Sequence, residues 1–86
     1  MACFAGEHSL ELARLALAES CFDEATAQAQ TALVLFRDVQ DGVGESQALE
    51  ILGNVCLRQG GYTAAIDHYQ RALRIMEVHG GRLAHG

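Results

Sequence analysis

The sequence predicts an all-α protein, an α-solenoid of two helix–turn–helix hairpins that together form one domain over residues 1–86. Half of the residues are apolar, proline is absent, and alanine and leucine outnumber the β-branched residues, a composition that favours helices over strands. The apolar residues recur at intervals of three and four, as on the buried face of an amphipathic helix. The chain also resembles itself after a shift of forty residues, which is typical of stacked structural repeats.

The internal repeat pairs residues 6–35 with residues 46–75. Several aligned positions keep size and polarity, as Phe22 and Tyr62 do. We therefore expect repeat one to span residues 6–40 and repeat two to span residues 46–80. Six aligned pairs are identical: Leu12 and Leu52, Leu17 and Leu57, Ala25 and Ala65, Gln30 and Gln70, Ala32 and Ala72, and Leu33 and Leu73.

Each repeat contains two apolar stripes, so the spacing predicts four helices. The first hairpin is broken at Ser20-Cys21 and the second at Gly60-Gly61, where glycine can adopt the left-handed conformation that ends a helix. The helices are expected at residues 7–19, 23–37, 45–59 and 63–78.

The helix ends and the connection between the repeats can also be predicted. Asp23 and Thr63 lie forty residues apart, and their side-chain oxygens are expected to cap the helices that follow the two breaks. The segment from Asp38 to Gly44 contains two glycines and is expected to be a longer linker. Gly42 and Gly44 each disfavour a continuous helix by roughly 1 kcal/mol. A form in which two chains exchange hairpins through a straightened linker is therefore less favoured.

The charge and hydropathy of the chain limit its partners. The net charge is −5, with six arginines and no lysine, so a clustered basic surface for nucleic acid is not expected. A charge-steered partner is expected to be basic. No stretch approaches the roughly 18 uninterrupted apolar residues of a membrane span, and the first residues lack the features of a signal peptide. We therefore expect a cytoplasmic protein without nucleic-acid or membrane partners.

The residues that usually carry catalysis or bind metals are scattered. Cys3, Cys21 and Cys56 form no paired motif and are expected to be small buried hydrophobes. The four histidines show no zinc-binding spacing, and the glycine pairs lack the residues of a phosphate-binding loop. We therefore predict no catalytic, cofactor-binding or metal-binding residues, and no enzyme activity.

One motif resembles a known family. Leu49-x-x-Leu52-Gly53-x-x-Cys56, followed by Tyr62 and Ala65-x-x-x-Tyr69-x-x-Ala72, is similar to the tetratricopeptide repeat pattern. Gly53 and Ala65 stand where the family has small residues at the contact of two helices. The period of forty resembles the subclass of the family with longer linkers. The resemblance implies a protein–protein interaction scaffold, which offers a groove to a segment of a partner protein.

In this family the first helix of each repeat lines the concave groove. Matching the motif residue by residue implies that Glu7, Leu10, Arg14 and Ala18 face the groove in repeat one. In repeat two the corresponding residues are Gln47, Glu50, Asn54 and Arg58. The peptide-binding residues are expected to be Arg14, Gln47, Glu50, Asn54 and Arg58. A simpler interpretation is that the two arginines are solvated surface charges, which contribute little by themselves.

Two other functions are compatible with the sequence. Stacked repeats usually need roughly three or more units to bury their apolar faces. The chain has two, and it ends where a third would begin. It is therefore either a piece of a longer array or a self-assembling module, such as a homodimer, in which another copy covers Ile66, Leu73 and Ile75. A third possibility is a regulatory appendage of a larger enzyme or transcription factor.

Overall fold

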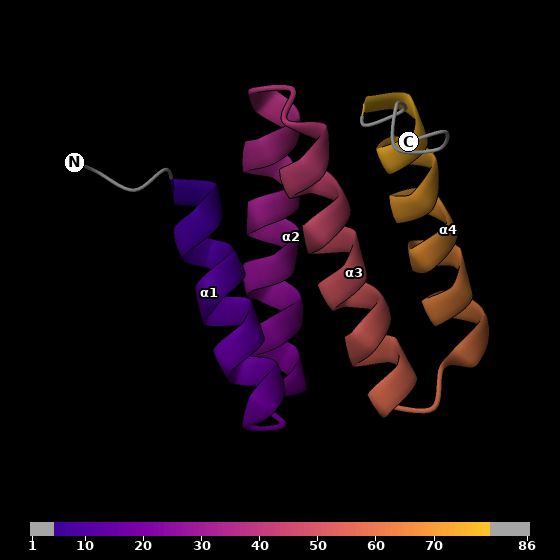
Figure 1. Ribbon diagram of the computed structural model, residues 1–86. Helices are drawn as coiled ribbons and strands as arrows, with labels where there is room; N and C mark the ends of the chain where they lie inside the picture. Colours follow the sequence, from indigo (N-terminus) through magenta and orange to yellow (C-terminus); the bar gives the residue numbers. More distant parts are fainter. Residues whose placement is uncertain (1–4, 80–86) are drawn as a thin grey trace.

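The computed structural model describes residues 5–79, which form four α-helices that lie side by side in chain order (Figure 1). They are α1 (Ala5–Ala18), α2 (Phe22–Asp38), α3 (Gly42–Arg58) and α4 (Tyr62–His79). α1 and α2 form one hairpin and α3 and α4 form the other. Within the described residues α3 packs against α2 and also touches α1, whereas α2 and α4 do not meet. The predicted all-α repeat fold is confirmed; Cys3 and residues 80–86 lie outside the described part.

The core runs between the helices and consists mainly of small side chains. Its larger cluster surrounds Phe36, the largest fully buried side chain, and contains Ala29, Ala32 and Ala48, none of which is exposed. A smaller cluster joins Val55 to the end of the first hairpin. Alanines at these positions let the helix axes approach closely. Because an alanine side chain buries little apolar surface, the few large residues provide much of it.

The three connections between the helices have the same structure. Each is three residues long, at residues 19–21, 39–41 and 59–61, and its middle residue is left-handed. The next amide donates to a carbonyl five residues earlier, which is the Schellman motif. The breaks predicted at Ser20-Cys21 and Gly60-Gly61 are confirmed. The φ angles are 62° at Ser20, 57° at Gln40 and 85° at Gly60, and the hydrogen bonds run from Cys21 to Ala16 (2.8 Å), Asp41 to Phe36 (2.9 Å) and Gly61 to Cys56 (2.7 Å).

Gln40→Gly is expected to stabilise the chain by about 0.5 kcal/mol. The left-handed conformation costs a residue with a Cβ roughly 1–2 kcal/mol, and added freedom of the unfolded chain offsets about 0.4–1 kcal/mol of the gain. Gly60→Ala should destabilise by a similar amount, because a Cβ there meets nothing within 4 Å and only the backbone conformation matters. Urea unfolding followed by circular dichroism measures both variants. Shifts in the same direction would contradict the shared turn geometry.

The connection between the hairpins is shorter than predicted. α3 begins at Gly42, so the expectation of a linker from Asp38 to Gly44 is wrong. The carboxylate of Asp41 caps α3 by accepting a hydrogen bond from the amide of Gly44 at 3.1 Å. A Cβ at Gly44 would lie 2.1 Å from a ring carbon of Phe36, so this glycine allows two helices to approach and does not form the turn. The period of forty therefore arises from helices of 17 residues and not from a long linker.

The predicted helix caps are also wrong. α2 begins at Phe22 and α4 at Tyr62, so Asp23 and Thr63 are the second residues of their helices. The Schellman turn is the physical reason, because the helix restarts two residues after the left-handed one. Cys21 therefore occupies the cap position of α2 without a side-chain cap bond. The negative charge of Asp23 still lies in the first turn of α2, where the helix dipole favours it.

Candidate functional site

The four predicted groove residues of α3 lie on one side of that helix. Gln47, Glu50, Asn54 and Arg58 follow one another at intervals of three and four, so their side chains project from the same face. Glu50 and Arg58 are exposed, while Gln47 and Asn54 are half-buried. The other sides of α3 are occupied by α2 and α4. We call this side of α3, together with Arg14 on the adjoining α1, the candidate face.

α1 contributes fewer residues to this face than predicted. Arg14, which precedes Asn54 by forty residues, is exposed, and so are Glu7 and Ala18. Leu10 is only 3% exposed and belongs to the main core cluster, so its assignment to the groove is wrong. The reason is that α3 touches α1, and this contact covers part of the surface that the repeat pattern assigns to the groove.

Asn54 is held in place by a tyrosine from the neighbouring helix. The hydroxyl of Tyr69 on α4 donates a hydrogen bond to Oδ1 of Asn54. Gly53 makes this contact possible, since a Cβ there would lie 2.8 Å from Cε1 of the Tyr69 ring. The first repeat has Arg14 and Ala29 at the corresponding positions and therefore cannot form the pair. The motif places Tyr69 at the contact between the two helices of the repeat. Its hydrogen bond to Asn54 is not predicted by the motif and is seen only in the structure.

The surroundings of Tyr69 keep its hydroxyl protonated. Burial raises the pKa of Tyr69 above its ordinary value of 10.0, and the nearby side chains of Glu50 and Cys56 raise it further. The hydroxyl is therefore a hydrogen-bond donor at neutral pH. Its hydrogen bond to Oδ1 of Asn54 leaves the two amide N–H groups of that residue available to other acceptors.

The stability of the chain should consequently fall at alkaline pH. The pKa of Tyr69 is higher in the folded chain than in the unfolded chain. The protonated hydroxyl of Tyr69 therefore stabilises the fold below about pH 10, and this stabilisation is lost as the pH rises through the folded-state pKa. Tyr69→Phe should lower the free energy of unfolding near neutral pH by about 1 kcal/mol. It should also weaken the dependence above about pH 10. Urea unfolding at neutral and alkaline pH measures both effects, and an unchanged alkaline dependence in this variant would contradict the assignment to Tyr69.

Arg58 contacts the first hairpin. Its Nη2 donates to the hydroxyl oxygen of Ser20 at 3.3 Å, and its guanidinium carbon lies 5.7 Å from the centre of the Phe22 ring. This cation–π contact joins the end of α3 to the turn between α1 and α2. Arg58 is thus at the edge of the candidate face with part of its hydrogen-bonding capacity already used. The sequence gives no direct signal for this contact, because the two partners are separated by more than thirty residues.

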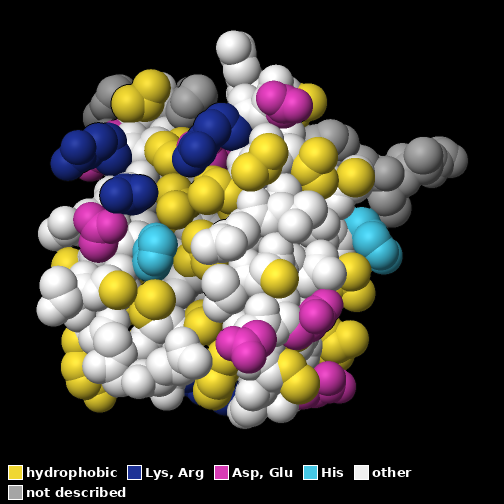
Figure 2. Space-filling model, turned by 180° about the vertical axis from the view of Figure 1, so that it is seen from behind, with side chains coloured by type: hydrophobic (Ala, Val, Ile, Leu, Met, Phe, Trp, Pro, Cys, Tyr) yellow, Lys and Arg dark blue, Asp and Glu magenta, His cyan; other side chains and the backbone are white. Residues whose placement is uncertain are grey.

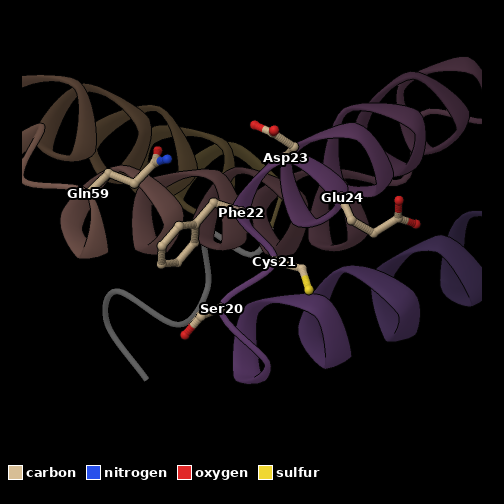
Figure 3. Close-up of a pocket in the computed structure, with 6 residues that line it drawn as sticks. All are labelled: Ser20, Cys21, Phe22, Asp23, Glu24 and Gln59. Carbon is tan, nitrogen blue, oxygen red and sulfur yellow. The ribbon is translucent and has the colours of Figure 1, made fainter.

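A hollow of about 530 Å³ lies beside this contact (Figure 3). Phe22 lines it, and the carboxylates of Asp23 and Glu24 lie away from the Phe22 ring. The lining residues are exposed except for Phe22, so the hollow is an open surface feature. Cys21 is exposed, which corrects the prediction of a buried cysteine, while Cys56 is half-buried. The residues that line the hollow are Ser20, Cys21, Phe22, Asp23, Glu24 and Gln59.

The remaining polar groups of the candidate face are free. Among the described residues, Arg14, Gln47 and Glu50 form no ion pair or side-chain hydrogen bond. The face therefore offers the positive charge of Arg14, the negative charge of Glu50 and the amides of Gln47 and Asn54, on α1 and α3. These groups suit polar and charged segments of another polypeptide better than an apolar small molecule.

Neither a metal site nor a membrane-spanning helix is found among the described residues. Over residues 5–79 no group of three or more His, Cys, Asp or Glu side chains is arranged to hold a metal ion. None of the helices in this range combines the length and apolar character that crossing a membrane requires.

Comparison with known proteins assigns the fold to a family. The model of the tetratricopeptide repeat matches residues 5–77, which includes both hairpins. No curated protein and no solved structure gave a significant match. This family has a non-catalytic repeat fold that generally mediates protein–protein interaction. Since the match covers nearly the whole described chain and the four helices have the expected arrangement, the chain belongs to the tetratricopeptide repeat family.

Proposed function

We propose that the candidate face binds a segment of a partner protein, which lies across α1 and α3. The observation that carries this proposal is the orientation of the Asn54 amide. Its oxygen accepts the hydrogen bond of Tyr69, so its two N–H groups remain for a ligand. A backbone carbonyl of the partner is a suitable acceptor, because every residue of a polypeptide has one. Asn54 thereby supports recognition of the main chain and depends little on the partner's sequence.

Selectivity is provided by the charged residues on either side. Arg14 can pair with a carboxylate and Glu50 with a basic side chain, and both are exposed and unpaired within the described chain. The net charge of −5 attracts positively charged segments at long range. The favoured ligand is accordingly a polar segment of net positive charge, with one acidic residue opposite Arg14.

Peptides selected from a random library displayed on phage test the proposal. Their affinities for the purified chain can be measured by fluorescence anisotropy. Asn54→Ala should weaken binding by about tenfold, which corresponds to the loss of one buried hydrogen bond of about 1.4 kcal/mol. Arg14→Ala and Glu50→Ala should alter the preference for charged peptides more than the overall affinity.

The matched control is Gln30→Ala. Gln30 has the same type of amide side chain as the binding residue, and it is exposed on α2, away from the candidate face. Binding should not change in this variant. If the selected peptides lose affinity equally in Gln30→Ala and Asn54→Ala, or in neither, the assignment of the face is wrong.

A further inference from the structure

An apolar stripe on α4 is left uncovered by the other helices of the described residues. Tyr62, Ile66, Tyr69, Leu73 and Met76 follow one another at intervals of four, three, four and three, which places them along one side of the helix. Tyr62 is 63% exposed, Ile66 55% and Leu73 63%, while the other two are half-buried. Hydrophobic side chains accordingly reach the surface along the lower left edge of Figure 2, on the side of α4. We call these five residues the α4 seam.

The first hairpin shows what such a stripe does in this fold. The counterparts of the seam, forty residues earlier on α2, are buried or half-buried because α3 packs against them. At one end of this stripe the ring of Phe36 lies against Gly44 of α3. The α4 seam therefore has the form of a surface that receives a helix. The α2 counterparts are Phe22, Thr26, Ala29, Leu33 and Phe36.

Ile75 does not belong to this surface. It was expected on the free face of the last helix, together with Ile66 and Leu73, but it is half-buried and packs against the main core cluster. Its position on the helix explains the difference, since it lies two residues from Leu73 and points towards α3. The prediction of exposure is confirmed for the other two residues.

α1 of a second copy is poorly suited to cover the seam. In α3 the buried residues Ala48, Ile51 and Val55 lie on the side that packs on the first hairpin. Their counterparts on α1 are His8, Glu11 and Leu15, all of which are exposed. Stacking α1 on the seam would bury the charge of Glu11 without a partner, which is strongly unfavourable. Chains are therefore not expected to join head to tail into filaments.

We propose that the α4 seam of a second copy covers this seam, so that two antiparallel α4 helices pack about a two-fold axis near Tyr69. Among the described helices, α4 is the one with an uncommitted apolar stripe along most of its length. The alternating spacing of four and three is that of paired helices. No residue of the seam is charged, and the nearby Asp67 and Arg71 pair with each other at 3.2 Å. The interface is closed, because each copy uses the same surface.

The dimer uses α4, whereas the proposed peptide site lies on α1 and α3. Tyr69 contributes to both surfaces, so it is not a useful position for a test. Ile66 and Leu73 are better, because both are more than half exposed and a charge there should leave the single chain folded. In the proposed arrangement Ile66 of one copy approaches Leu73 of the other, since they lie three and four residues on either side of Tyr69.

Sedimentation equilibrium of the full chain tests the dimer. The wild-type chain should show a monomer–dimer equilibrium with a dissociation constant below ~200 µM. Ile66→Glu and Leu73→Glu should each raise the dissociation constant at least tenfold, with the helical circular dichroism unchanged. Val34→Glu is the control, because Val34 is 59% exposed on α2 and lies outside the seam. Its dissociation constant should equal that of the wild type.

The double variant Ile66→Glu with Leu73→Arg tests the antiparallel arrangement. The introduced charges meet as opposite pairs across the two-fold axis, so the double variant should dimerise more tightly than either single glutamate variant. A wild-type chain that remains monomeric at ~200 µM would overturn the proposal and assign the seam to a further repeat or another protein. The proposal would also be overturned if the dissociation constant were unchanged in both single glutamate variants. The same holds if the double variant dimerised no more tightly than either of them.

Discussion

Replacing Phe36 by alanine should remove a large part of the stability of this protein. Phe36 is 2% exposed and is the largest fully buried side chain, in a core cluster that includes five alanines, whose side chains are too small to fill the space it would leave. Such a truncation costs about 3–5 kcal/mol. A chain of this length has a total free energy of unfolding of roughly 4–13 kcal/mol. We therefore expect urea unfolding, followed by circular dichroism, to show a much lower midpoint or no folded baseline.

Val34→Ala is the matched control for this experiment. Val34 lies two residues before Phe36 on α2 but is 59% exposed. Its truncation should change the free energy of unfolding by less than about 0.5 kcal/mol. A loss below about 1 kcal/mol for Phe36→Ala, or equal losses for both variants, would contradict the buried position of Phe36 in the contact between the hairpins.

Gly44→Ala should be destabilising by about 1 kcal/mol net, although alanine is the better helix former. Helix propensity alone favours alanine by about 1 kcal/mol. The new Cβ would, however, lie 2.1 to 2.5 Å from three ring carbons of Phe36. The buried ring cannot move away without opening the contact between α2 and α3, and such overpacking costs about 1–3 kcal/mol. Urea unfolding gives the sign, and a stabilised variant would show that the helices do not approach so closely.

A double-mutant cycle identifies the ring as the cause. In the background of Phe36→Leu, whose side chain lacks the ring, Gly44→Ala should cost at least about 1 kcal/mol less than in the wild type. Additive effects of the two substitutions would mean that the alanine is unfavourable for another reason.

The second repeat was predictable because its residues match a packing pattern. Gly53, Ala65 and Tyr69 stand at the motif positions, and the structure places each at the contact between α3 and α4. The connection between the repeats was not predictable from the same kind of reasoning. Gly42 and Gly44 have the composition of a turn, whereas both lie in the first turn of α3, and the approach of Phe36 requires a glycine at position 44. Local composition cannot distinguish a glycine used for a turn from one used for close packing.

The candidate face was predictable as a list of positions but not as a set of interactions. Arg14, Gln47 and Glu50 are accessible as the repeat pattern implies. Leu10 is covered because the contact between α1 and α3 depends on the angle at which the hairpins stack. The bond between Asn54 and Tyr69 joins residues fifteen positions apart and depends on the same packing. The sequence does indicate this bond indirectly, because Gly53, which makes room for the Tyr69 ring, immediately precedes Asn54.

Nuclear magnetic resonance of the isotope-labelled chain, titrated with a peptide selected from the library, tests the proposed binding face most directly. The largest shifts are predicted for the side-chain amide of Asn54 and for backbone amides of α1 and α3, near Arg14 and Glu50. Gln30 on α2 should provide an unaffected reference. Shifts concentrated instead at the hollow of residues 20–24, or along α4 around Ile66 and Leu73, with the Asn54 amide unchanged, would contradict binding at this face.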